Sequence, residues 1–300
     1  MVMKNNVNLS AIICICVLLL TSLNLGTLAQ SGKMFDCFEL QRLAQDCYYQ
    51  ANFVDAAQIE LKRYQCSGDN EALYNAAQMF AMQNNADSAF YYLEKAVESD
   101  SSMYRLTKGT FFNLVEDFRW RQITEKQLIK FEMKFGHIKC RDIALLLCDM
   151  LVKDDAYHEL IAIKPDMADS LWALKKVVNA ELLKEIKQIT DSIGWPKISE
   201  VGVEFSMAPF MVVLHSGDLE VMRYYLKMIR KSVRKQDALP MTYAYLIDRI
   251  RLREKRKQLY GTQMTALGKY VDINSVTNVR NINKRRERMG LSPCYLFYTP

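Results

Sequence analysis

The residues whose types suggest chemistry lie in the C-terminal third of this 300-residue chain. His215 ends an apolar stretch, and imidazole titrates close to neutral pH, so this residue is a candidate general base. An acidic and a basic residue follow as the neighbours Asp248 and Arg249. The tetrapeptide "YGTQ" at 260–263 then places a phenol and an amide on either side of a small turn. These groups suit the binding of a polar ligand.

Two consecutive arginines near the C-terminus add positive charge to this set. Guanidinium groups bind carboxylate or phosphate in bidentate fashion, and Tyr and Gln supply orienting hydrogen bonds. If the fold brings these residues together, they form a site for an anionic ligand, with His215 as its base. The candidates are His215, Asp248, Arg249, Tyr260, Gln263, Arg285 and Arg286. The alternative is a polar network that fixes the geometry of a loop.

The partner and role of His215 stay open at this stage. Either Asp248 or the pair Asp154 and Asp155 could orient the imidazole, and a histidine at a helix end is also common as a structural cap. The chain contains no Gly-x-Ser-x-Gly elbow, no phosphate-binding glycine loop and no His-Glu-x-x-His. It contains no Cys-x-x-Cys, and its three histidines follow no ligand spacing, so neither a metal nor a cofactor is predicted. Whether the protein is an enzyme is left undecided.

The elements that must position these residues are helices. Only 11 Gly and 6 Pro occur beside many Leu, Met, Ala, Glu and Lys, which favours a mainly α protein. A long amphipathic helix is expected from about 169 to 193, ended by Gly194 and stopped by Pro196. Its predicted apolar face is Leu171, Leu174, Val178, Leu182, Ile186, Ile189 and Ile193. The segment "FSMAPFMVVL" predicts a buried helix that delivers His215, and amphipathic helices are expected over 219–235 and after Pro240.

The order of motifs from residue 194 onward is specific. The segments are "GWP", "VG", "LHSG", "YLIDR", "YGTQ" and "RRERMGL". Over about residues 145–297 this order resembles the bacterial domain of unknown function 6624, for which no activity can be transferred. The resemblance implies that 260–263 is a hallmark in which Gly261 adopts a tight backbone and lets Tyr260 and Gln263 face one point. Upstream, "KDDAYHEL" departs from the Asp-Gln and Arg of the family, so a role that needs that Arg does not carry over.

Two helical pairs are recognisable in the N-terminal half. In "EALYNAAQMFAMQNNADSAFYYLEKAVESD" small residues line the faces of two helices, and a weaker copy lies about 32 residues upstream. The pattern resembles tetratricopeptide repeats, and residues 104–135 supply an aromatic-rich cap. The predicted organisation is a repeat region with its cap over 30–138 and a helical domain over 139–300, with room for a short β-hairpin around Tyr260 and Val271.

The first 29 residues predict a secretory signal peptide. Lys4 precedes an apolar run of about ten residues, which is shorter than the roughly 20 needed to span a bilayer, and small residues lead to cleavage after Ala29. A membrane anchor is the alternative. We therefore expect a secreted or periplasmic protein with no integral membrane segment after cleavage. Six cysteines remain in the mature chain, where they either form disulfides or are buried thiols.

Charge narrows the expected partners. The net charge is +6, with the basic excess between Arg223 and Arg288, where it is either an anion-binding surface or a solvated face. Because the chain is expected outside the cytoplasm, nucleic acid is not an expected partner. The leading hypothesis is a binding or scaffold protein whose repeats present a surface to a protein or peptide partner. The alternative is an enzyme or receptor for a small anionic ligand, which would use the polar residues of the C-terminal domain.

Overall fold

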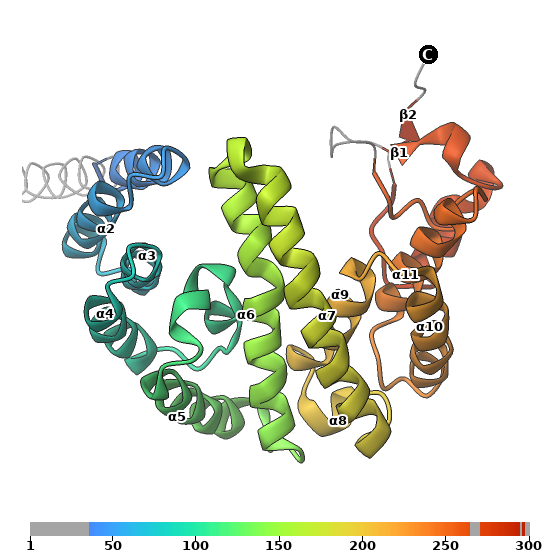
Figure 1. Cartoon of the computed structure of the whole chain (residues 1–300), viewed down its shortest axis with the longest axis horizontal. Helices are drawn as coiled ribbons and strands as arrows, with labels where there is room; N and C mark the ends of the chain where they lie inside the picture. The colour runs from blue at the N-terminus through green and yellow to red at the C-terminus, as the bar shows by residue number, and fades with distance from the viewer. Residues whose placement is uncertain (1–35, 265–270, 295, 298–300) are drawn as a thin grey trace, which may run out of the picture. The chain divides into compact units, whose positions relative to one another are not determined.

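The protein is built of helices, as predicted. The computed structural model describes residues 36–264, 271–294 and 296–297, so the predicted signal peptide lies outside the described residues. The described chain forms two compact units, which are divided between Ser99 and Asp100. The segment 104–135, which was expected to cap the repeats, belongs to the second unit, whereas the sequence placed the domain boundary near residue 138. Figure 1 shows the order of the elements.

The first unit consists of consecutive packed helices. A helix over residues 36–49 precedes α2 (Phe53–Ser67), α3 (Asn70–Met82) and α4 (Ala86–Glu98), and α3 packs against both α2 and α4. Small side chains at the crossings are fully buried: Ala57, Ala72, Ala76, Ala77, Ala89 and Ala96. Because alanine lets helix backbones approach closely, these positions explain the tight helical-repeat arrangement. Asn52, Asp69 and Asn85 cap the three N-termini through their side chains.

Two cross-links strengthen this unit. A disulfide joins Cys37 to Cys66 and so ties the first helix to the end of α2. Arg63 and Glu60 form a buried ion pair at 2.6 Å, and Asn75 of α3 donates to the same carboxylate at 2.9 Å. Four further cysteines of the described chain are not in disulfides, namely Cys47, Cys140, Cys148 and Cys294.

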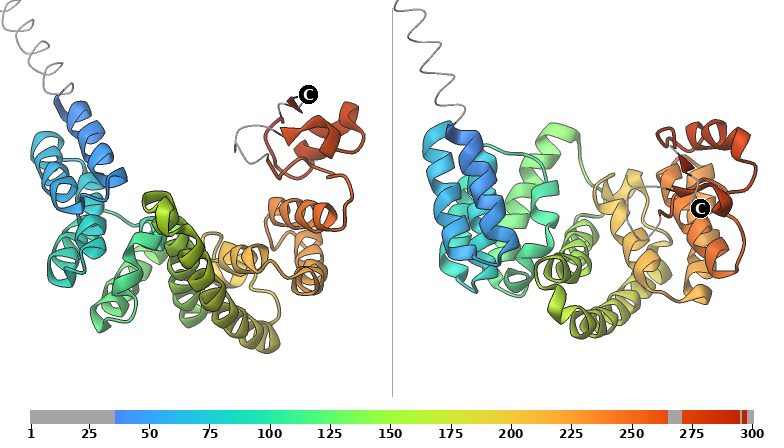
Figure 2. Two further views of the ribbon diagram at one scale, coloured as in Figure 1. Left: turned by 45° about the horizontal axis from the view of Figure 1, so that its top comes forward. Right: turned by 90° about the horizontal axis from the view of Figure 1, so that it is seen from above.

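The second unit is organised around one long helix. Its elements are η1 (Tyr104–Thr107), η2 (Gly109–Leu114), α5 (Phe118–Phe135), α6 (Arg141–Ile163), η3 (Pro165–Met167), α7 (Ala168–Ile193), α8 (Ile198–Val201), η4 (Phe205–Met207), α9 (Ala208–His215), α10 (Leu219–Arg234), α11 (Pro240–Arg253), β1 (Val271–Asp272), η5 (Ile273–Ser275), η6 (Val279–Asn281), α12 (Ile282–Glu287) and β2 (Leu296–Phe297). Helix α6 contacts η2, α7 and α9, and it runs side by side with α7 in every view (Figures 1 and 2). The residues near the α6–α7 contact are therefore held by long, rigid helices.

The contact between η2 and α6 requires a glycine. A Cβ atom on Gly109 would lie 2.5 Å from the backbone nitrogen of Ala156 and 2.6 Å from the carbonyl carbon of Asp155. The amide of Gly109 donates to the Asp155 carboxylate at 3.2 Å. Absence of a side chain at this position lets η2 lie directly on the α6 backbone.

Two local predictions differ from the structure. Helix α7 ends at Gly194, where φ is 75°, as expected, but Leu174 is 51% exposed and does not belong to the buried face. The helix is covered on one side only, so its predicted apolar face is wider than its packed face. Among the described residues, β1 and β2 pair in parallel, with Val271 opposite Leu296, so this pair is not a hairpin around Tyr260.

The helix crossings of the first unit yield a stability prediction. Ala89 is fully buried on α4, so Ala89→Trp is expected to overfill the crossing and lower the free energy of unfolding by about 1–3 kcal/mol. Chemical denaturation measures this change. Tyr91→Trp, at a position 54% exposed on the same helix, is the control and should leave stability nearly unchanged. Equal stability of the Ala89 variant and the wild type would contradict the packing.

Candidate functional site

The loop at 258–263 is built around the carboxylate of Asp248. This residue of α11 is fully buried, and its Oδ1 accepts from the backbone amides of Leu259 and Tyr260 at 2.6 and 3.2 Å. Its Oδ2 accepts from the amides of Tyr260 and Thr262, both at 3.1 Å, and from the Thr262 hydroxyl at 3.0 Å. A carboxylate with this many donors is anchored. Asp248 therefore fixes the loop, and it makes no contact with His215 that would orient the imidazole.

The chemistry of this buried carboxylate follows from its neighbours. Burial raises the pKa of Asp248, while the amide donors of the loop partly offset that effect by stabilising the charged form. Gly261 within the loop has φ of 60°, and a Cβ there would lie 3.0 Å from Ile282 and 3.3 Å from Val271. The tight backbone expected at Gly261 is thus present, and it has a positive φ. A larger residue would be strained both by its backbone and by its neighbours.

Arg285 and Arg286 hold the same loop from its other side. The acceptors of Arg285 are the carbonyls of Leu259, Thr277 and Asn278, at 2.7 to 3.0 Å, and those of Arg286 are the carbonyls of Ser292, Tyr260 and Gly261, at 2.6 to 3.2 Å. Both guanidinium groups bind backbone oxygens. The predicted charge partners for an anion thus connect the loop to the segments around it.

Arg249 is placed differently. Its Nε donates to Oε1 of Gln263 at 2.6 Å, and a terminal nitrogen lies 3.5 Å from the carbonyl of Leu214, next to His215. In the described part of the chain no carboxylate lies within ion-pair distance of this half-buried guanidinium. Burial, together with the charge of Arg253, lowers the pKa of Arg249. This cation has only neutral partners.

His215 pairs with the upstream acidic segment. Its Nδ1 lies 2.7 Å from Oδ2 of Asp154 on α6, and Asp154 is 3% exposed. Lys175 of α7 donates to the Asp154 carbonyl at 2.6 Å and lies 3.3 Å from Oδ1. Burial would raise the pKa of Asp154, but the hydrogen bond and charge of His215 and the charge of Lys175 outweigh it and lower that pKa. An ionised Asp154 favours a proton on Nδ1, which makes Nε2 of His215 the basic nitrogen.

A second histidine completes this cluster. The rings of His158 and His215 lie 4.8 Å apart between centroids, and Trp172 lies 5.4 Å from His158 in an edge contact. Nε2 of His158 is buried without a hydrogen-bond partner. Burial, followed by the charges of Lys175 and His215, lowers the pKa of His158 to about 4, so this ring is neutral at pH 7. In the sequence, His158 stands out only as part of the segment "KDDAYHEL", which departs from the family pattern.

The predicted residues thus divide into two clusters. The loop cluster is Asp248, Arg249, Tyr260, Gln263, Arg285 and Arg286. The histidine cluster joins His215 to Asp154, Lys175 and His158, which lie on α6 and α7. Of the two predicted partners of His215, the acidic pair at 154–155 is the one in contact with it, and the contact is made by Asp154. Arg249 links the clusters only by way of the Leu214 carbonyl.

Comparison with known proteins supports the C-terminal domain. Residues 162–298 match the model of a family of unknown function, DUF6624, so the resemblance is confirmed over that range. The match contains His215 and the whole loop cluster but begins after Asp154 and His158, and it does not reach the helices of the first unit. No curated protein and no solved structure matches the chain. Within the described residues, none of the helices combines the length and the apolar character needed to cross a membrane.

The histidine cluster predicts a pH dependence of stability. The pKa of His158 falls from 6.5 to about 4 on folding, so the unfolded chain takes up this proton first as the pH drops. The free energy of unfolding that depends on neutral His158 is therefore fully present above pH 6.5 and is lost progressively toward pH 4. Asp154, Lys175 and His215 are the charged or titratable groups that face this ring. His158→Gln is therefore expected to reduce the fall in Tm between pH 7 and pH 4.

The control for this measurement is His137→Gln, at a side chain 74% exposed. Differential scanning calorimetry of the three proteins compares their acid-induced loss of Tm. The control should lose as much as the wild type. If His158→Gln also loses as much, His158 does not become buried in its neutral form.

Proposed function

We propose that the protein is a binding or scaffold protein that acts outside the cytoplasm. The observation that carries the proposal is that Asp248, Arg285 and Arg286 bind backbone groups of one loop. The most prominent polar residues of the C-terminal domain therefore build the domain and are not left for a ligand. This is the arrangement expected of a scaffold, in which polar networks fix the shape of the presented surface.

The helices of the first unit supply a surface for a partner. We infer tetratricopeptide-like repeats from their alternating packing and from the buried alanines of α3 and α4. Tyr91 is 54% exposed and Tyr64 is 37% exposed, and Lys95 lies 4.2 Å above the ring of Tyr91. The pKa of Lys95 is raised, chiefly by its hydrogen bond to Tyr91 and to a smaller extent by Tyr64. Exposed tyrosines are enriched at protein-binding surfaces. We call Tyr64, Tyr91 and Lys95 the tyrosine patch.

The proposed location outside the cytoplasm is supported by a disulfide, a bond that is stable in an oxidising compartment. Cys37 and Cys66 form a disulfide. Disulfides persist in secreted and periplasmic proteins and are rare in the cytoplasm. This bond supports the export that the N-terminal 29 residues predict. A periplasmic or secreted scaffold would meet its partners there.

A photo-crosslinking experiment tests this function. A photoreactive phenylalanine analogue in place of Tyr91 is expected to form discrete adducts with a partner in the extracytoplasmic fraction of the native host. The same analogue in place of the exposed Gln58 on α2 is the matched control. The proposal fails if irradiation yields no adduct specific to position 91, or if the protein is recovered only from the cytoplasm with its N-terminus intact.

A second candidate function is a receptor or enzyme for a small anion. The half-buried Arg249 lacks a carboxylate partner in the described chain, and the Asp154–His215 pair at 2.7 Å has the geometry of an oriented base. An anion at Arg249 would be held by Gln263 beside the end of α9. This function would use His215, Arg249 and Gln263, while the other loop residues would support them.

Thermal shift with phosphate and citrate as probes tests this second candidate. If Arg249 binds anions, either probe should raise the Tm of the wild type, and Arg249→Ala and Gln263→Ala should each abolish the rise while remaining folded. A ligand at one hundred times its Kd stabilises a protein by about 2.7 kcal/mol. Arg230→Ala, at an exposed arginine of α10, controls for binding to the basic surface. No rise in the wild type, or an equal loss in the Arg230 variant, would exclude this site.

A further inference from the structure

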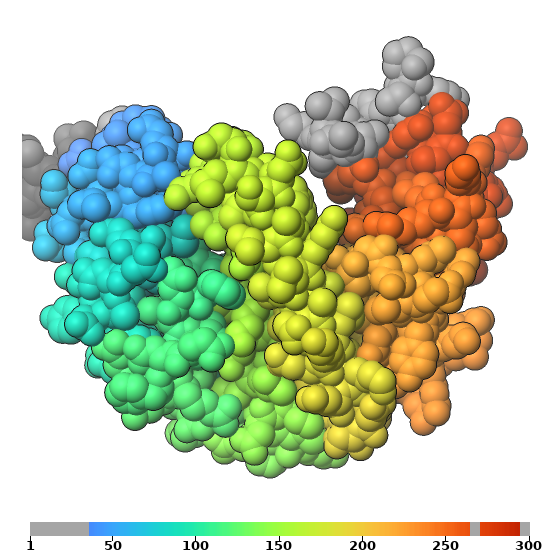
Figure 3. Space-filling model, in the orientation of Figure 1, coloured from blue at the N-terminus to red at the C-terminus, as the bar shows by residue number. Residues whose placement is uncertain are grey.

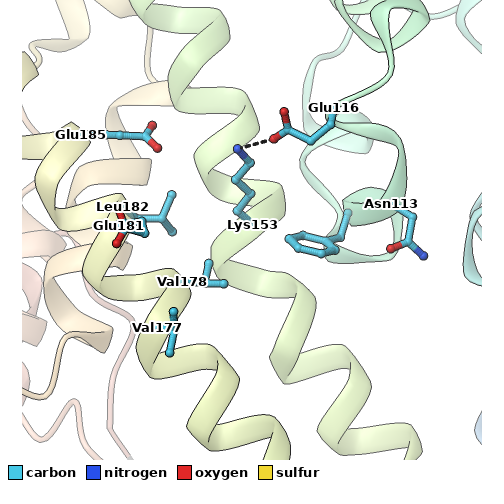
Figure 4. A pocket seen from close by; sticks show the side chains of 9 residues that line it. Asn113, Glu116, Lys153, Val177, Val178, Glu181, Leu182 and Glu185 are labelled. Atoms are coloured by element: carbon cyan, nitrogen blue, oxygen red, sulfur yellow. Dashed lines mark ion pairs between the residues drawn. The ribbon is translucent and has the colours of Figure 1, made fainter.

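A pocket of about 360 Å³ lies between η2, α6 and α7 (Figure 4). Its α7 side is formed by Val178, Glu181, Leu182 and Glu185, which are spaced at i, i+3, i+4 and i+7 and therefore share one helix face. Phe112 of η2 stands opposite, and Leu182, which is 1% exposed, lies deepest on the α7 side. The pocket has an apolar interior.

Acidic groups dominate the rim of this pocket. Its ionisable residues are Glu116, Glu181, Glu185 and Lys153, which sum to a charge of −2, whereas the whole chain carries +6. Lys153 is paired with Glu116 at 2.8 Å, so its charge is already balanced. Glu181 pairs at 2.8 Å with the exposed Lys184 on its own helix, which is a weak, solvated contact. Glu185 forms no ion pair with any residue that the structure describes.

The apolar surface continues beyond the pocket along α7. Leu174 is 51% exposed and Val177, which also lines the pocket, is 63% exposed. Together with Val178 and Glu181 they again follow the i, i+3, i+4, i+7 spacing. Figure 3 shows η2, α6 and α7 exposed on one face of the molecule. An apolar strip that extends from a small pocket fits a polypeptide better than an isolated small molecule, because only a chain would cover both.

We propose that this groove binds a segment of a partner protein in which an apolar side chain is adjacent to a lysine or arginine. The apolar side chain would occupy the space between Phe112 and Leu182, and a volume of about 360 Å³ is sufficient for it. The cationic group would lie beside Glu181 and Glu185, which attract it by charge complementarity. The inference rests on the proposed binding function but places a second contact surface in the C-terminal unit, whereas the tyrosine patch belongs to the first unit.

Fluorescence anisotropy of the full chain with a labelled peptide of alternating leucine and lysine tests the proposal. Glu185→Lys is expected to weaken binding about tenfold, because it replaces an attraction by a repulsion at the rim. Glu94→Lys makes the same charge change at an exposed position of α4 and should leave the affinity within about twofold of wild type. Val177→Ser should weaken binding by several fold, and its match is Val54→Ser, 59% exposed on α2.

Two further peptides separate charge from apolar contact. A leucine and glutamate peptide, and a serine and lysine peptide, should both bind at least about tenfold more weakly than the leucine and lysine peptide. The proposal is overturned if either binds equally well, or if each control variant loses as much affinity as its partner. If the pocket variants have no effect while photo-crosslinking at Tyr91 succeeds, the groove is excluded and the scaffold function stands. If both fail, the binding function itself is rejected.

Discussion

The buried carboxylate of Asp248 is the interaction on which the C-terminal segment depends. A buried carboxylate must be satisfied by donors, and among the described residues the donors that reach it are the amides and hydroxyl of the loop at 259–262. Wrapping the loop around an acceptor turns backbone carbonyls outward, and Arg285 and Arg286 bind those carbonyls. Asp248, the turn at Gly261 and the two arginines therefore all contribute to the conformation of this one loop.

The second buried carboxylate, Asp154, shows the opposite electrostatics. Asp248 faces neutral donors, so burial prevails and its pKa is raised, whereas the pKa of Asp154 is lowered by its hydrogen bond to His215 and by the positive charge of Lys175. The difference separates two roles. A carboxylate among amides shapes a loop, while Asp154 joins α6, α7 and α9 through its contacts with Lys175 and His215.

The sequence predicts the helices and their ends well because those depend on local signals. Gly194 and Pro196 stop α7, and the turn at Gly261 demands a residue without Cβ. The partner of His215 could not be chosen from the sequence, because Asp154 lies 61 residues away and no local pattern distinguishes it from the other acidic candidate, Asp248. Leu174 was misplaced for a related reason: periodicity shows that a face is apolar, but not how much of it a neighbour covers.

These contacts also show that several basic side chains of the second unit already have partners and are not available to bind a ligand. Arg285 and Arg286 bind carbonyls, and Lys153 and Lys175 bind carboxylates, so much of the positive charge near the packed helices already has a partner. Two charged groups at the sites described above make no ion pair with a described residue: Arg249, whose hydrogen-bond partners are neutral, and Glu185, at the rim of the apolar groove. The carboxylate lies beside exposed valine and leucine, where apolar contact can add to charge, whereas the contacts shown for Arg249 are hydrogen bonds to the Gln263 side chain and the Leu214 carbonyl. Binding of a basic, apolar segment thus has two favourable contributions, and binding of a small anion has one.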